Sequence, residues 1–279
     1  TYSCIEEQDV FIPDETTGFG ELEFQSPLLD FYEVQGLQFQ EFTVDPSKDE
    51  VLESAGQLKI FLPAGTLADS EGNTASNPAK IQLLEAFSKG DLVLFNIASA
   101  YPDILHTLEA AFFIGATAGG KPLKINPATG YEVNIPLEVS GGNITLFAGE
   151  WPTQRYFNWS ESATKVKEAS YTLNNGATLY GQALQLQQLF WNGLGQSLGF
   201  TGPRTKLYAR TLAAYDPENT SVFFVFDHYS AVLELQWESA NNSPAFYMPD
   251  VPTGESGRLI LISKQSDGNY HFDQRAIHI

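Results

Sequence analysis

Short segments in which apolar and polar residues alternate recur along this chain, and clusters of turn-forming residues separate them. In QLKIFLP, residues 57–63, the apolar Leu58, Ile60 and Leu62 alternate with Gln57, Lys59 and Phe61. This period of two is typical of a β-strand with one buried face, and the proline that follows ends the strand. Because helical spacers are missing between such segments, the pattern predicts an antiparallel, all-β fold.

The same succession of strand-like segments and turns continues to the C-terminus. Strands are predicted at AKIQLLEAF, AAFFIGAT, YEVNIP and ITLFA in the first half, and at TKLYART, SVFFVFD, AVLELQW, AFYMP, RLILIS and NYHFD in the second. Turn signals such as Asp216-Pro217, Asn241-Asn242 and Asp267-Gly268 separate the later strands at the spacing of a sandwich. The segment 171–191 fits either a strand pair or one amphipathic helix, and the pattern leaves residues 177–200 open.

A chain of 279 residues is long enough for two domains, each with a core of its own. The strand-like pattern is interrupted at EWPTQRYFNWSESATK, and this interruption predicts a domain boundary near residue 160. We therefore predict an extended acidic tether over residues 1–30, a first β-sandwich over 31–160 and a second β-sandwich over 161–279, in series.

Charge and cysteine content exclude several classes of function. The 34 acidic residues against 15 basic ones give a net charge of −19, which repels nucleic acid and anionic membranes. One cysteine makes neither an internal disulfide nor a zinc site built on paired cysteines. The longest apolar stretch, 92–105, is interrupted by Asn96, Pro102 and Asp103, so no membrane-spanning helix is expected. No cofactor is expected either.

Several motifs together resemble a known family. They are GQLKIFLPAGT at 56–66, the Asp69, Gly72 and Asn73 of a D-x-x-G-N hairpin, GGKPLKI, the VFFVFDHYSAVLEL pair and the VPTGESGRLILIS ending. The chain resembles a family of Bacteroidetes surface lipoproteins of unassigned function, over roughly residues 36–279. Their first domain is similar to the β-sandwich shared by ankyrins, zonula occludens proteins and netrin receptors. At 105–109 the chain departs from the glycine pair expected there.

That resemblance implies a sandwich fold and protein binding, and it supplies no catalytic residues. It also gives a meaning to the single cysteine. Cys4 is followed at once by Glu6, Glu7 and Asp9, as in the export signal of such lipoproteins. We expect Cys4 to carry a lipid, residues 1–3 to belong to a signal peptide, and the protein to lie on the outer-membrane surface. The alternative is an incidental cysteine in the terminal segment.

Two sets of residues are candidate ligand sites. Asp69, Glu71 and Asn73 place oxygen ligands at alternate positions, as calcium loops do, although the glycine spacing favours a plain hairpin turn. The aromatic residues Trp151, Tyr156, Phe157 and Trp159 are candidates for stacking on sugar rings, or else they pack a seam between the two domains.

A catalytic interpretation of the chain is weak. The string GQSLG at 195–199 matches a nucleophile elbow around Ser197, with Asp227 and His228 downstream. An elbow needs a strand-to-helix turn, and two adjacent residues of a strand point to opposite faces. Among the other histidines, His106, His271 and His278, no pair has metal-binding spacing on one element apart from the distant His271 and His278. We therefore expect no catalytic residues and no metal site.

Together these patterns predict a non-catalytic interaction or scaffold protein of the outer membrane. Its expected partner is an envelope or surface protein bound through a sandwich face or an edge strand, its only membrane contact is a lipid on Cys4, and it binds no nucleic acid. The alternative is a secreted carbohydrate-binding or carbohydrate-processing protein, marked by an exposed aromatic row or a carboxylate-lined cleft.

Overall fold

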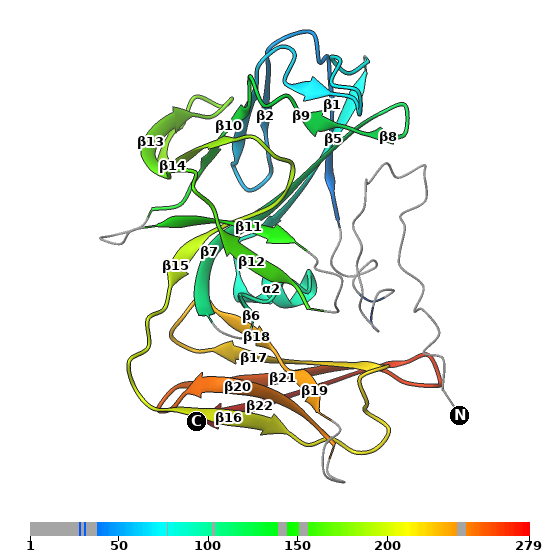
Figure 1. The fold of residues 1–279 in the computed structure, drawn as a ribbon, viewed down its shortest axis with the longest axis vertical. Helices are drawn as coiled ribbons and strands as arrows, with labels where there is room; N and C mark the ends of the chain where they lie inside the picture. Colours follow the sequence, from blue (N-terminus) through cyan, green and yellow to red (C-terminus); the bar gives the residue numbers. More distant parts are fainter. Residues whose placement is uncertain are drawn as a thin grey trace.

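The computed structural model describes residues 28, 31, 38–76, 78–101, 104–138, 144–150, 156–238 and 244–279. Almost all of the regular structure in these residues is β-strand in antiparallel sheets, so the predicted all-β class is confirmed. The strands form two stacks, one above the other in Figure 1. We call them the first and second sandwich.

The first sandwich consists of two facing sheets. One sheet runs β1 (Gln40–Val44), β5 (Ala79–Ala86), β7 (Ile104–Ala118), β15 (Phe190–Ser197), β11 (Thr145–Glu150) and β12 (Asn158–Glu161), with β8 (Lys121–Pro122) on β7. The other runs β13 (Lys167–Thr172), β14 (Thr178–Leu186), β10 (Tyr131–Ile135), β3 (Lys59–Leu62) and β2 (Glu50–Glu53). The small pair β4 (Leu67–Ala68) and β9 (Lys124–Ile125) lies beside them.

Alternation along the strands explains the core of this sandwich. Ile60 of β3 is opposite Val133 of β10, which is opposite Leu184 of β14, so three strands place apolar side chains on one face. These side chains pack with Ile81 and Phe112 from the facing sheet. The predicted alternation in residues 57–63 is confirmed, because its three apolar positions are buried while Phe61 is 38% exposed.

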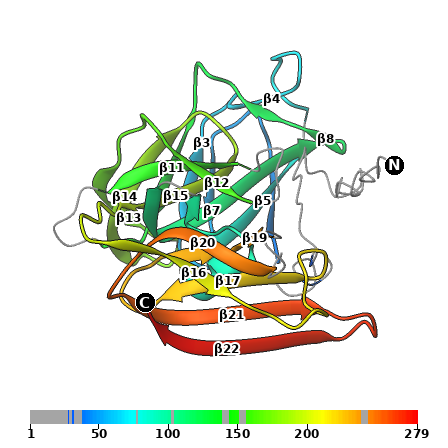
Figure 2. The same ribbon diagram turned by 60° about the horizontal axis from the view of Figure 1, so that its bottom comes forward.

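The second sandwich is built from the C-terminal residues. Its longer sheet runs β18 (Val232–Glu234), β17 (Thr220–Phe226), β21 (Ser256–Lys264) and β22 (Tyr270–His278). Its shorter sheet runs β16 (Arg204–Ala209), β20 (Ala245–Pro252) and β19 (Gln236–Glu238). Phe224 and Leu233 from the first of these sheets pack with Phe246 and Met248 from the second. Figure 2 shows β21 and β22 side by side at the outer border of the molecule.

One continuous sheet joins the two sandwiches. The short β6 (Ala100–Tyr101) pairs antiparallel with β7 and parallel with β18. Beside this junction lies α2 (Lys89–Leu94), which Ser88 and Asp91 cap at its N-terminus through reciprocal hydrogen bonds. A second apolar cluster fills the seam, where Phe113 and Trp191 from one sandwich and Phe223 from the other belong to the same packed group.

Hydrogen bonding does not follow the predicted boundary at residue 160. β14 and β15 come after it, yet β14 pairs with β10, and β15 pairs with β7 and β11, all within the predicted 31–160 sandwich. β13 joins the same sheet through β14. Segment 171–191, which fitted a helix or a strand pair, forms strands, because Leu184 and Leu186 complete the first core. The division into 31–160 and 161–279 remains a prediction. Most of the tether lies outside the described residues.

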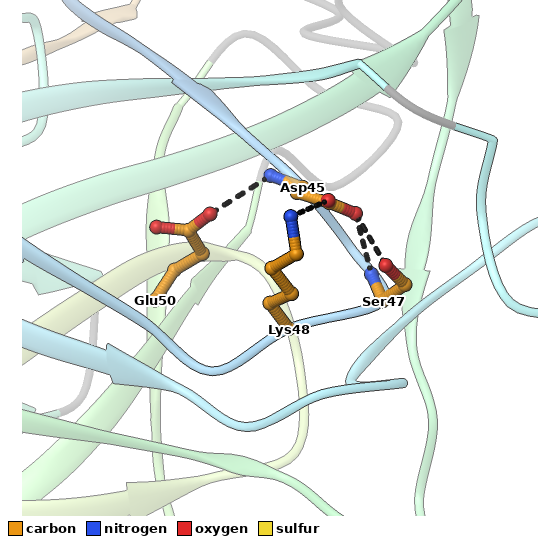
Figure 3. Close-up of polar contacts among 4 residues, drawn as sticks. All are labelled: Asp45, Ser47, Lys48 and Glu50. Atoms are coloured by element: carbon orange, nitrogen blue, oxygen red, sulfur yellow. Dashed lines mark hydrogen bonds and ion pairs between the residues drawn. The ribbon is translucent and has the colours of Figure 1, made fainter.

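The turn between β1 and β2 shows how acidic residues support this fold (Figure 3). The Asp45 carboxylate contacts the Lys48 ammonium at 2.8 Å and accepts hydrogen bonds from the backbone amide and hydroxyl of Ser47. The Asp45 amide in turn donates to Glu50 Oε1 at 3.0 Å. The Lys48 contact, helped by Ser47, lowers the pKa of Asp45 to about 2. This turn is therefore held best when Asp45 is ionised.

No helix in the described part of the chain is long and apolar enough to span a membrane.

Candidate functional site

The outer edge of β22 is the longest open edge of the second sandwich. β22 pairs with β21 along its whole length, from Tyr270 to His278, and no strand among the described residues pairs with its other side. The Ile279 amide donates to the Glu255 carbonyl oxygen, and this bond shows which residues of β22 form hydrogen bonds with β21. Every second residue of β22 therefore exchanges backbone hydrogen bonds with β21. The residues between them, which include Ala276, direct their backbone N–H groups to the open edge.

A groove runs beside this edge, between β22 and β16. Two adjoining cavities of about 560 and 610 Å³ share the lining residues Arg210, Thr211, Leu261 and Asp273, so they form one continuous groove. Its floor includes Leu259 and Leu261, which also pack against the core of the second sandwich. The groove lies between two edge strands of two different sheets, a shape that fits an extended chain.

Charged side chains line the groove. Leu259 and Leu261 are opposite Arg275 and Asp273 in the β21–β22 register, so these charged residues share the groove face of the sheet. Within the part of the chain that the structure describes, neither the Arg210 nor the Arg275 side chain makes a hydrogen bond or an ion pair. Inward-pointing charges at a sheet edge discourage unwanted strand pairing. They also select among partners, because two arginine side chains without an ion pair favour a strand that brings carboxylates to them.

The outer face of the shorter sheet carries an aromatic pair. Tyr208 of β16 is opposite Tyr247 of β20, which is opposite Gln236 of β19. The two rings lie with their centroids 6.2 Å apart and their planes only 26° from parallel, and Tyr208 is 45% exposed. Two neighbouring rings beside an amide give this face an aromatic surface with one polar partner, which is suited to stacking.

The aromatic residues singled out in the sequence lie elsewhere. Trp151 lies outside the described residues, and Tyr156 is half-buried. Trp159 is 6% exposed and donates its indole N–H to the Ala98 carbonyl at 3.0 Å. It packs edge-to-face on Phe157, within the seam cluster. The buried rings of Phe157 and Trp159 therefore present no stacking surface to a sugar.

The carboxylate oxygens of the candidate cation loop accept hydrogen bonds from the loop itself. Asp69 Oδ1 accepts the backbone amides of Glu71 and Asn73, both at 2.9 Å, and the Asn73 amide group reaches toward both carboxylates at 3.4 Å. The hydrogen bond from the backbone amide of Asn73 is the main cause of the lowered pKa of Asp69. No group of three or more metal-ligating side chains occurs among the described residues. Asp69 here stabilises a turn.

Ser197 lies beside a histidine that the sequence did not single out for it. Ser197 and His106 are opposite each other on β15 and β7, with Ser197 Oγ 3.2 Å from His106 Nδ1. Burial lowers the pKa of His106, and Glu161 opposes this shift. Asp227 and His228 follow the end of β17, and both are exposed. β15 has a β-bulge between Leu194 and Gly195 but continues as a strand to Ser197, so the strand-to-helix turn of a nucleophile elbow is missing here.

The groove residues Arg210, Asp273 and Arg275 were not predicted as a site. The signal was present in NYHFDQRAIHI, where Asp273 and Arg275 share one face of the strand with the apolar Ile277, as inward-pointing charges do in edge strands. Cys4 lies outside the described residues. No protein-family model matches this chain, and a comparison with curated proteins gives no match. Function is therefore inferred from the chemistry of these surfaces.

Proposed function

We propose that this protein is a non-catalytic interaction module of the outer-membrane surface, which binds an extended segment of an envelope protein along β22. The observation that carries the proposal is the nine-residue open edge with a groove beside it. A strand added to this edge gains main-chain hydrogen bonds, and its alternate side chains enter the groove. Arg210 and Arg275 favour a segment in which apolar residues alternate with acidic ones.

The anchor is a separate part of the proposal and rests on the sequence around Cys4. Expression of the full precursor in its native host, followed by intact-mass measurement of the membrane-bound protein, is expected to show loss of residues 1–3 and addition of a lipid. A Cys4→Ser variant is expected to appear unlipidated in the medium. Membrane retention of that variant would rule out the lipid anchor, and it would not affect the proposal that the groove binds a partner.

Edge pairing is tested with a photo-crosslinking amino acid at position 212, where an exposed leucine lines the groove, so that both arginines stay in place. The experiment uses the same full-length precursor and host. Ala276 directs its amide to the open edge, so Ala276→Pro removes a donor that only an added strand uses, and edge strands tolerate proline. Ala276→Ser is the matched control. We expect a discrete protein adduct in the parent and in Ala276→Ser, and its loss in Ala276→Pro.

Thermal unfolding of both variants checks that they remain folded. An adduct that persists in folded Ala276→Pro would refute strand addition, and the absence of any adduct in the parent would refute the groove as an interaction site. Peptide mapping of the adduct should identify an extended segment that carries acidic residues.

The Tyr208–Tyr247 pair supports a second candidate function, the binding of a carbohydrate on the outer face of the shorter sheet. An exposed aromatic row is the mark expected of that alternative. A glycan array probed with the full-length protein tests it, with Tyr208→Ala and Tyr180→Ala as test and control. Binding that Tyr208→Ala removes and Tyr180→Ala keeps supports this function, and equal losses in the two variants contradict it.

A further inference from the structure

A separate cup lies at the far end of the molecule, on the hairpin formed by β13 and β14 (upper left in Figure 1). It has a volume of about 420 Å³ and is lined by both strands of the hairpin and by Leu137 and Glu138, which follow β10. None of its lining residues belongs to the groove beside β22. The cup is therefore a different site from the groove.

The register of the hairpin shows which side chains form the walls. Glu168 is opposite Gln182, and Ser170 is opposite Tyr180, so these four side chains lie on one face of the strand pair. Between them, Ala169 and Gly181 are opposite each other and supply the floor. A methyl group on Gly181 would lie 1.9 Å from the Ile135 carbonyl oxygen, so glycine is required at this position.

The walls of the cup offer acceptors and an aromatic ring. Tyr180 is 68% exposed, so its ring is open to solvent. Gln182 is 93% buried in contrast, at 7% exposure, and its amide nitrogen is directed to the Leu137 carbonyl at 3.4 Å. The amide oxygen of Gln182 has no hydrogen-bond partner in the part of the chain that the structure describes.

The two carboxylates of the cup, those of Glu138 and Glu168, are also without a hydrogen bond or an ion pair among the described residues. No lysine or arginine lines the cup. Lys167 precedes Glu168, but adjacent residues of a strand project to opposite faces, so its side chain points away. The result is two negative charges, a free amide oxygen and an open aromatic ring, on a chain of net charge −19.

We propose that this cup binds the guanidinium group of an arginine side chain from a partner protein. A planar guanidinium stacks on an aromatic ring and donates several hydrogen bonds to carboxylates, which matches the groups present. A neutral saccharide also stacks on tyrosine, but it gains nothing from the two unpaired charges. The field of the acidic surface further concentrates cations near the cup.

The probe is the peptide acetyl-Gly-Arg-Gly-amide, with the citrulline peptide as its uncharged isostere, and binding to the full-length protein is followed by ligand-detected NMR. We expect saturable binding of the arginine peptide and at least about tenfold weaker binding of the citrulline peptide. Glu168→Gln and Tyr180→Ala should each weaken binding by about threefold or more. Raising the salt concentration should weaken it further.

Glu150→Gln and Tyr208→Ala are matched controls, since they remove an exposed acid and an exposed tyrosine outside the cup, and they should leave binding unchanged. Thermal unfolding checks that all four variants fold. Equal binding of the citrulline peptide, no effect of Glu168→Gln, or no binding at all would overturn the proposal. Binding of methyl glucoside instead, lost in Tyr180→Ala, would assign the cup to a saccharide. Ala276→Pro should not alter any of these results.

Discussion

Removal of the Glu85 carboxylate should destabilise the first sandwich strongly, although Glu85 lies on an edge of the core. Its oxygens accept hydrogen bonds from the Ser54 hydroxyl, from Gln40 Nε2 at 2.6 Å and from the Gly56 amide at 3.0 Å. Ser54 Oγ in turn accepts the amide of Leu58 at 2.8 Å. One carboxylate on β5 therefore fixes the turn that joins β2 to β3 in the facing sheet.

The magnitude follows from these contacts. A hydrogen bond to a charged group contributes about 1.5–3 kcal/mol, and water replaces part of this where the donors are half-exposed. We therefore expect Glu85→Ala to lower the free energy of unfolding by about 2–4 kcal/mol. Glu85→Gln keeps one acceptor oxygen but places an amide group against that of Gln40, so about half of this loss is expected.

Urea unfolding, followed by tryptophan fluorescence, measures both variants. Glu71→Ala is the control, because the Glu71 carboxylate is exposed and accepts one side-chain hydrogen bond among the described residues, from Asn73 at 3.4 Å. This control should stay within about 0.5 kcal/mol of the parent. If Glu85→Ala is as stable as Glu71→Ala, the carboxylate does not hold the turn and the reasoning is wrong.

Three further predictions follow from individual contacts. The pKa of Asp45 in the folded chain, about 2, lies below its ordinary value of 3.8. Its contribution to stability is therefore present above about pH 4 and lost as the pH falls from about 4 to 2; Asp45→Asn should abolish this part of the pH dependence of the urea midpoint. Tyr131 is 1% exposed and donates its hydroxyl to the Gln188 carbonyl at 2.8 Å, so Tyr131→Phe should cost about 1 kcal/mol in urea unfolding. Ser197 should not react with a fluorophosphonate probe on the folded protein, and labelling that Ser197→Ala removes would establish a nucleophile there.

Local patterns in the sequence were sufficient for the fold class and for some of the core. The alternation at Leu58, Ile60 and Leu62 determines which face of a strand is buried, because successive side chains of an extended chain point to opposite sides. The turn at Asp69 is also local, since its carboxylate accepts amides only two and four residues away. Both features depend on neighbours along the chain, which the sequence displays directly.

The choice of partner strands was decided by the tertiary structure. β14 and β15 join the first sandwich because Leu184 and Leu194 fill a core shared with Val133 and Phe112, and such distant contacts leave no local pattern. Ser197 meets His106 rather than His228 for the same reason. The groove requires two sheets to meet, because Arg210 and Arg275 come from different sheets. The cup requires β10 to pair with the β13–β14 hairpin, which brings Glu138 to the same cavity as Glu168. The sequence determined which faces are apolar, and long-range packing determined which faces meet.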